Sequence, residues 1–339
     1  MSKTYNMAIV GATGLVGGTM LSVLEEDREL PIGQLRLMAT ANSAGKRLPF
    51  RDQEIAVEDV AQASFKGVDI ALFAGGETAS ADYVRRAVAE GAVAIDNSSL
   101  FRMDPQVPLV VPEVNGQALE RHRGIIANPN CSTIQLMPVL AALHREWGVE
   151  SVSIASYQSV SGAGKEAVQE LRQSTADFLA GQSRRQSKVF PHSIAFNLFP
   201  QIGSFDSEGH STEEWKMVCE TRKIMDLPQL PVLATCVRVP VFFAHSEAVQ
   251  MSFSKACDPQ RAREILAQTP CVKVLDDTAK GLYPTPIDGE GQDLVLVGRI
   301  RRDMTAKHGL AMWIVADNLR KGAATNAVNI ARALIARQG

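Results

Sequence analysis

A cysteine at position 131 lies inside a polar run, residues 128–135 (NPNCSTIQ), which follows an apolar segment at 124–127. Asn130 and Ser132 both suit the N-cap of a helix that begins here. At a helix start, unpaired backbone N–H groups and the helix dipole favour negative charge and lower the pKa of a thiol. A cysteine that only packs in a core needs no such polar neighbours. We therefore interpret Cys131 as a thiolate nucleophile.

A second chemical pattern lies near the N-terminus, where three glycines follow the apolar residues 7–10 and precede a predicted amphipathic helix that ends near Glu26. Glycines at this spacing allow a tight turn and let a pyrophosphate approach the helix N-terminus. Glycine turns also exist merely to pack a helix on a strand, but this one opens an alternating strand–helix pattern. The predicted cofactor contacts in the turn are Gly11, Thr13, Gly14, Leu15, Val16 and Gly17.

The second predicted strand, residues 35–39, indicates which dinucleotide binds. An NAD-binding fold usually has Asp or Glu near the end of this strand, to hold the ribose 2′-hydroxyl. Here residues 40–47 (TANSAGKR) contain no acid but contain hydroxyls, an amide and two cations. That composition tolerates a 2′-phosphate and favours NADP over NAD. The alternative is a solvated turn with incidental Lys46 and Arg47.

The remaining pattern divides the chain in two. Further apolar runs at 68–73 and 92–96, with a helical pattern at 80–90, predict repeated βα units up to about residue 128. The first part is therefore expected to be a Rossmann-type, doubly wound parallel sheet. In the second part we expect a helix at 132–146, a strand at 152–157, a glycine loop at 161–165 that opens a helix to about 180, and a polar loop at 203–214.

Alternating runs dominate after residue 230 and predict an α+β domain with a mainly antiparallel sheet. A long Pro- and Gly-rich loop is expected at 281–292, and a final helix follows. The predicted strands and final helix are 232–241, 248–253, 294–300, 310–315 and 321–336.

Composition excludes several classes of function. The 339 residues carry a net charge of −2, which gives no reason to expect a nucleic-acid partner. The five cysteines form no CxxC pair, which argues against a structural zinc site or disulfide scaffold, and we expect no metal. No apolar run approaches the roughly 18 residues that span a membrane, and the polar residues 1–7 predict no signal peptide. The expected compartment is the cytoplasm.

With these features in place, the sequence resembles the aspartate-β-semialdehyde dehydrogenase family over nearly the whole chain, in the form common in Gram-positive and some other bacteria. The motifs that carry the resemblance are residues 11–17 (GATGLVG), 96–99 (DNSS), 101–104 (FRMD), 110–115 (VVPEVN), 128–135 (NPNCSTIQ), 157–165 (YQSVSGAGK), 238–241 (RVPV), 245–247 (HSE) and 322–327 (GAATNA).

The resemblance implies an NADP-dependent enzyme that reduces an acyl phosphate. β-Aspartyl phosphate would acylate Cys131, phosphate would leave, and NADPH would reduce the thioester to aspartate semialdehyde. The reaction would serve lysine (through diaminopimelate), threonine and methionine biosynthesis. The resemblance also implies a homodimer formed through a catalytic and dimerisation domain at 130–318. Residues 1–129 and the C-terminal helix, 319–339, would form the NADP-binding domain.

The resemblance also implies roles for single residues. Gln158 would orient the thioester, His245 would be the general acid/base, and Arg238 would bind the substrate carboxylate. Glu220 would hold the substrate amine. Lys223, Arg102 and Asn130 would hold the phosphate, and the remaining cofactor contacts would be Ala41, Asn42, Ser161, Gly162 and Asn318.

Position 42 departs from the family pattern. The family often has Ser-Arg-Ser-Ala-Gly where residues 41–45 of this chain are ANSAG. The arginine that pairs with the 2′-phosphate is therefore Asn42 here, which weakens the expected selectivity for NADP. Two alternatives remain: an N-acetylglutamyl-phosphate reductase-like enzyme, which shares the chemistry but has different motifs, and a catalytically silent paralogue. A silent paralogue should have lost Cys131, Arg238 or His245, and all three are present.

Overall fold

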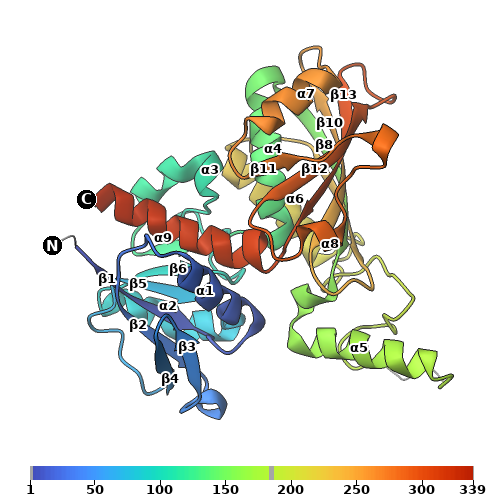
Figure 1. The fold of residues 1–339 in the computed structure, drawn as a ribbon. Coiled ribbons are helices and arrows are strands. Elements are labelled where there is room, and N and C mark those ends of the chain that lie inside the picture. The colour runs from blue at the N-terminus through green and yellow to red at the C-terminus, as the bar shows by residue number, and fades with distance from the viewer. Residues whose placement is uncertain (1–2, 183–186, 339) are drawn as a thin grey trace. The chain divides into compact units, whose positions relative to one another are not determined.

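A computed structural model of the chain describes residues 3–182 and 187–338. The chain forms two compact units (Figure 1). One unit comprises Met1–Asn130 and Ala323–Gly339, and the other is Cys131–Gly322. The domain boundaries expected from the sequence, 129/130 and 318/319, lie one and four residues from these limits.

The unit that contains the N-terminus has a seven-stranded sheet in the order β3-β4-β2-β1-β5-β6-β7. All neighbouring strands are parallel except the β3–β4 pair, which is antiparallel. The strands are β1 (Tyr5–Val10), β2 (Ile32–Ala39), β3 (Arg47–Phe50), β4 (Gln53–Asp59), β5 (Ile70–Phe73), β6 (Val93–Asp96) and β7 (Ile125–Ala127). The doubly wound parallel sheet is thus confirmed, whereas β3 and β4 were not predicted.

Helices cover this sheet because its central strands are apolar on both sides. All four residues of β5 are buried, as are the last four of β1, so neither face of the sheet can meet water. Helices α1 (Leu15–Glu26) and α9 (Thr325–Gln338) share one apolar core with the strands. Helix α2 (Gly76–Ala89) packs against β5 and β6 outside that cluster. The short α3 (Pro112–Asn115) contacts α9.

The second unit has a six-stranded sheet in the order β11-β12-β13-β10-β8-β9. Its three central pairs are antiparallel, as predicted, and parallel pairs, β11–β12 and β8–β9, stand at the two edges. The strands are β8 (Val149–Gln158), β9 (Val232–Arg238), β10 (His245–Phe253), β11 (Val272–Val274), β12 (Val295–Arg302) and β13 (Gly309–Ala316).

Three helices cover one face of this sheet, and only the short α8 (Pro286–Gly289) contacts β13 on the other. Helices α4 (Cys131–Trp147), α6 (Thr212–Met225) and α7 (Pro259–Ala267) pack on the strands and on one another. Beneath them, alternate residues of β8, β9 and β10 are buried, while the residues between them, except the buried Ser246, are half-buried or exposed. This period of two is the signature of a sheet with one solvated side. Helix α5 (Lys165–Leu179) extends away from the sheet (Figure 1).

Two loop predictions in this unit were wrong. Residues 203–214 were expected to be a loop, but α6 begins at Thr212 and is fixed by a capping box between Ser211 and Glu214. The expected loop at 281–292 contains α8 (Pro286–Gly289). Within residues 3–182 and 187–338, no helix combines the length and the apolar character that crossing a membrane requires.

Candidate active site

Cys131 is the first residue of α4 and is half-buried. The first turn of α4 has no acidic residue, so the positive end of the helix dipole is not offset there by a carboxylate. Asn130, the residue immediately before the helix, is buried. A Cβ added to Gly322 would lie 3.0 Å from Cβ of Cys131, so glycine at 322 leaves space for the Cys131 side chain. The local structure therefore agrees with the environment predicted for a reactive thiol.

Three predicted site residues meet at one end of the second sheet. Gln158 ends β8 and Arg238 ends β9, and the two are paired across the parallel ladder. His245 begins β10, which runs antiparallel to β8, and it is paired with Ala316 at the end of β13. All three face the helix-covered side of the sheet and are at least 95% buried. The strand order itself therefore brings these residues together from distant parts of the sequence.

The His245 ring is held through one of its two nitrogens. The backbone N–H of Ser159 donates to Nδ1 at 3.1 Å, which places the proton of the neutral ring on Nε2. Nε2 is buried and has no hydrogen-bond partner in the described part of the chain. Complete burial, helped by the charge of Arg238, lowers the pKa of His245 to about 3. A Cβ on Gly162 would lie 3.3 Å from Nε2, so glycine there keeps the ring accessible.

Arg238 lies beside both His245 and Cys131. Its Nη1 donates to the carbonyl oxygen of Ser159 at 2.6 Å. Burial lowers the pKa of Arg238, while the negative charges of Glu213 and Cys131 raise it. Because this electrostatic interaction is reciprocal, the guanidinium stabilises a thiolate at Cys131.

Gln158 is oriented by a residue that sequence reasoning missed. Its Nε2 donates to Oε1 of Glu213 and to Oγ of Ser156, both at 3.2 Å. Glu213 lies in the first turn of α6, and Glu220 and Lys223 follow on the same face at helical spacings of seven and ten residues. Glu220 is 1% exposed. The signal that could have located α6 is the Ser-x-x-Glu pattern at 211–214.

Asn318 ties the loops around the histidine together. Its Oδ1 accepts from the Ser159 and Ser161 hydroxyls at 3.0 and 3.2 Å and from the backbone N–H of Ala244 at 3.0 Å. The Ser159 hydroxyl is itself 3.0 Å from Nδ1 of His245. Asn318 thus supports His245, and its expected contact with the nicotinamide stays a prediction.

The other unit carries the predicted phosphate-binding turn. Gly11 has φ +87°, and a Cβ there would lie 2.7 Å from the backbone nitrogen of Gly75. Gly14 is the N-cap of α1 and supplies no side-chain cap, so the first amides of α1 suit an anion. The Thr13 hydroxyl donates to that of Ser43 at 3.1 Å and links this turn to the short helix Ala41–Ser43, on which Asn42 is exposed. This arrangement fits a dinucleotide.

The predicted residues are divided between the two units. Arg102 and Asn130 belong to the first unit and are buried, and Arg102 donates to the carbonyl oxygen of Asn97 at 2.8 Å. Ser161 and Gly162, expected at the cofactor, lie in the second unit next to Asn318 and His245. Across residues 3–182 and 187–338, no three His, Cys, Asp or Glu side chains are grouped so that they could hold a metal ion.

Comparison with known proteins agrees with this geometry. Residues 6–122 match the family described as semialdehyde dehydrogenase, NAD binding domain, and residues 140–321 match semialdehyde dehydrogenase, dimerisation domain. The chain is 49% identical to the aspartate-semialdehyde dehydrogenase of Aquifex aeolicus, with 98% of both chains covered. It is 44% identical to that of Bacillus subtilis, again over 98% of both chains.

The solved structures agree with the sequence relatives. The crystal structure of aspartate semialdehyde dehydrogenase II from Vibrio cholerae, complexed with ASA, superposes with a TM-score of 0.96 at 45% identity, with 99% of both chains covered. A structure of the enzyme with NADP from Candida albicans has a TM-score of 0.78 at 24% identity and supports the fold alone. The chain therefore belongs to the aspartate-semialdehyde dehydrogenase family.

Proposed function

We propose that this protein reduces β-aspartyl phosphate to aspartate β-semialdehyde with NADPH, through a thioester on Cys131. One observation carries the proposal. Cys131 begins a helix next to the Arg238 charge, in the same unit as a buried histidine whose Nε2 has no hydrogen-bond partner among the described residues. A thiolate, a fixed cation and a group able to transfer protons are what acyl transfer to sulfur requires.

The chemistry follows from these positions. The Cys131 thiolate attacks the acyl carbon, a C–S bond forms, and the bond from carbon to the phosphate oxygen breaks, which releases phosphate. NADPH supplies the hydride that reduces the thioester. His245 Nε2 exchanges a proton with the reacting oxygen or sulfur as the C–S bond breaks and the aldehyde leaves. Gln158, fixed by Glu213, would direct its amide toward the thioester.

Substrate recognition is assigned by charge. The planar guanidinium of Arg238 would hold the α-carboxylate bidentately, and Glu220 would pair with the amine. Lys223, one turn after Glu220 on α6, would attract the phosphate. Arg102 and Asn130 stay predicted phosphate ligands.

NADP is the proposed cofactor. The uncapped N-terminus of α1 and the glycine turn suit its pyrophosphate, and the turn at 41–43 contains no acid that would repel a 2′-phosphate. Asn42 cannot make the charged contact of an arginine, so we propose only modest selectivity over NAD.

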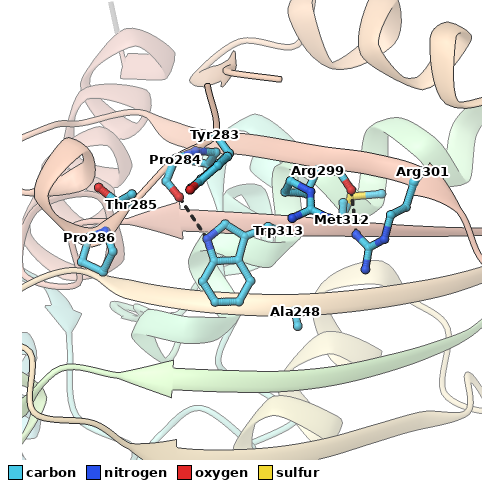
Figure 2. Close-up of a pocket in the computed structure, with 9 residues that line it drawn as sticks. All are labelled: Ala248, Tyr283, Pro284, Thr285, Pro286, Arg299, Arg301, Met312 and Trp313. Atoms are coloured by element: carbon cyan, nitrogen blue, oxygen red, sulfur yellow. Dashed lines mark hydrogen bonds between the residues drawn. The ribbon is translucent and has the colours of Figure 1, made fainter. Parts of the chain in front are cut away.

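We further propose a cytoplasmic homodimer that serves lysine, threonine and methionine biosynthesis. The residues matched to the dimerisation domain include every strand of the second sheet, and α4, α6 and α7 leave one face of that sheet to the short α8 and to half-buried side chains such as Trp313. That face has a pocket of about 280 Å³ around Trp313, with Arg299 and Arg301 on one side and residues 283–286, which lead into α8, on another (Figure 2). The Trp313 indole donates to the carbonyl oxygen of Pro284 at 3.1 Å. A second copy of the chain is the proposed occupant of this face.

The decisive assay is reduction of NADP by aspartate semialdehyde, with and without inorganic phosphate. We expect turnover that requires phosphate, because phosphate must displace the acyl group from sulfur in this direction. Equal or faster turnover of N-acetylglutamate semialdehyde would instead favour the N-acetylglutamyl-phosphate reductase-like alternative. Turnover of neither would favour the silent paralogue.

A further inference from the structure

A buried carboxyl group lies next to the catalytic histidine, and the proposed chemistry does not use it. Glu247 is 0% exposed and lies two residues after His245 on the same side of β10. Neither of its carboxyl oxygens has a hydrogen-bond partner within residues 3–182 and 187–338. A buried polar group in this condition costs free energy unless another group compensates, so its presence calls for a reason.

The group that faces Glu247 is Gln135, which is also 0% exposed. The Gln135 amide acts on the Glu247 carboxyl and opposes the large rise that burial causes in its pKa. The Gln135 amide and the Glu247 carboxyl do not meet hydrogen-bond geometry in the structure. Neither Nε2 nor Oε1 of Gln135 has another hydrogen-bond partner among the described residues. Cys236 lies on β9, one strand beyond β8, and the charge of Glu247 adds to the rise that burial causes in the pKa of its thiol. Among the described residues, no cation balances a negative charge on Glu247.

These properties define the protonation state of the pair. A carboxylate has acceptors only, and it would leave the Gln135 carbonyl without a donor as well as burying an uncompensated charge. A neutral carboxylic acid has one donor and one acceptor, which match the acceptor and donors of the amide. The two side chains are therefore complementary only when Glu247 carries a proton.

The pair has a geometric consequence for the nucleophile. Gln135 lies four residues after Cys131 on α4, an axial rise of about 6 Å. Glu247 lies two residues after His245 on β10, a step of about 6.8 Å. Helix α4 packs directly on β10. The distance from Cys131 to Gln135 along the helix is therefore nearly equal to the distance from His245 to Glu247 along the adjacent strand. A contact between Gln135 and Glu247 therefore limits how far α4 can slide along β10, and so limits how far Cys131 can move relative to His245.

We propose that Glu247, as a neutral carboxylic acid, pairs with Gln135 and so sets the position of Cys131 relative to His245. Glu247 is a positioning residue, because it acts through α4 rather than on the substrate. The inference rests on the proposed function only in taking Cys131 as the nucleophile. It explains why an uncompensated carboxyl is buried under the site.

The test compares Glu247→Gln with Glu247→Leu. The glutamine variant keeps a neutral donor and acceptor, so we expect kcat within about threefold of the parent and the same pH profile. The leucine variant fills the space but cannot pair. We expect its kcat to fall tenfold or more, its KM to stay within about threefold, and iodoacetamide to alkylate Cys131 more slowly. Val249→Ala, at the next buried position of β10, controls for a general packing defect and should keep the parent kcat.

A reversed pair keeps the proposal testable if Glu247→Leu does not fold. Gln135→Glu alone should lose activity, and adding Glu247→Gln should restore it, because an acid and an amide face each other again. Three results would overturn the proposal: parent-like kcat and alkylation in Glu247→Leu, a pH profile shifted by a unit or more in Glu247→Gln, or no rescue by the reversed pair. Alkylation of Cys131 needs no turnover, so a failure of the proposed reaction would be seen separately, in the parent.

Discussion

Titration of His245 should by itself destabilise the second unit when the pH falls from 7.5 to 5. Burial lowers the pKa of this histidine from 6.5 to about 3 in the folded protein. Above pH 6.5 neither the folded nor the unfolded chain protonates it, so it adds no pH dependence. Below 6.5 the unfolded chain binds a proton that the folded one does not, and stability falls until the pH reaches the folded pKa.

The magnitude follows from the width of that window. At pH 5 the pH lies 1.5 units below 6.5, the pKa of the histidine in the unfolded chain. At 1.36 kcal/mol per unit, protonation of the unfolded chain lowers the free energy of unfolding by about 2 kcal/mol. This value requires only that the folded pKa lies well below 5. The side chain is completely buried, so solvent does not screen the effect. His245→Gln removes the titrating group and should remove this share of the acid sensitivity.

Urea unfolding followed by tryptophan fluorescence measures the effect in the relevant unit. All three tryptophans, Trp147, Trp215 and Trp313, belong to Cys131–Gly322. We expect the parent to lose about 2 kcal/mol more than His245→Gln between pH 7.5 and 5. His192→Gln, which alters an exposed histidine of the same unit, should behave like the parent. If parent and His245→Gln lose equal free energy, a depressed pKa is the wrong description of His245.

Three further predictions follow from single positions. Asn42→Arg should raise the ratio of kcat/KM for NADP to that for NAD by about ten- to a hundredfold, since a charged hydrogen bond contributes roughly 1.5–3 kcal/mol; an unchanged ratio would mean that position 42 does not face the 2′-phosphate. Gly322→Ala, which adds a methyl 3.0 Å from Cβ of Cys131, should lower kcat roughly tenfold. Gly116→Ala, whose nearest neighbour would be 3.8 Å away, should not, and equal losses would refute the steric argument. Trp313→Arg should shift the sedimentation of the protein toward the monomer if the sheet face that carries Trp313 is the dimer interface, and an unchanged dimer would place the interface elsewhere.

The sequence predicted local features best. The strand, glycine turn and helix at residues 5–26 and the helix start at Cys131 could be found because each depends on residues close together in the chain. Helix α6 was missed although its capping box was visible, because its polar first turn continues a polar stretch. Because α6 was missed, its residue Glu213, which accepts a hydrogen bond from Gln158, was missed as well.

The rest of the site could not be read from spacing. Asn318 is 159 residues from Ser159, and only the tertiary structure shows that its amide supports the loop that holds His245. Glu247 looks like an ordinary charged residue beside His245, and its burial against Gln135 depends on the packing of α4 on β10. Motifs locate chemical groups, whereas the protonation and orientation of those groups depend on tertiary contacts.

The central claim is the covalent step at Cys131, and one measurement tests it most directly. Incubation with aspartate semialdehyde and NADP, without phosphate, should leave an acyl adduct that peptide mass spectrometry locates at Cys131. Added phosphate should release the adduct, and Cys131→Ala should fold normally but show only background turnover. An adduct at another residue would contradict the account, as would a Cys131→Ala variant within about tenfold of the parent, a gap of only about 1.4 kcal/mol.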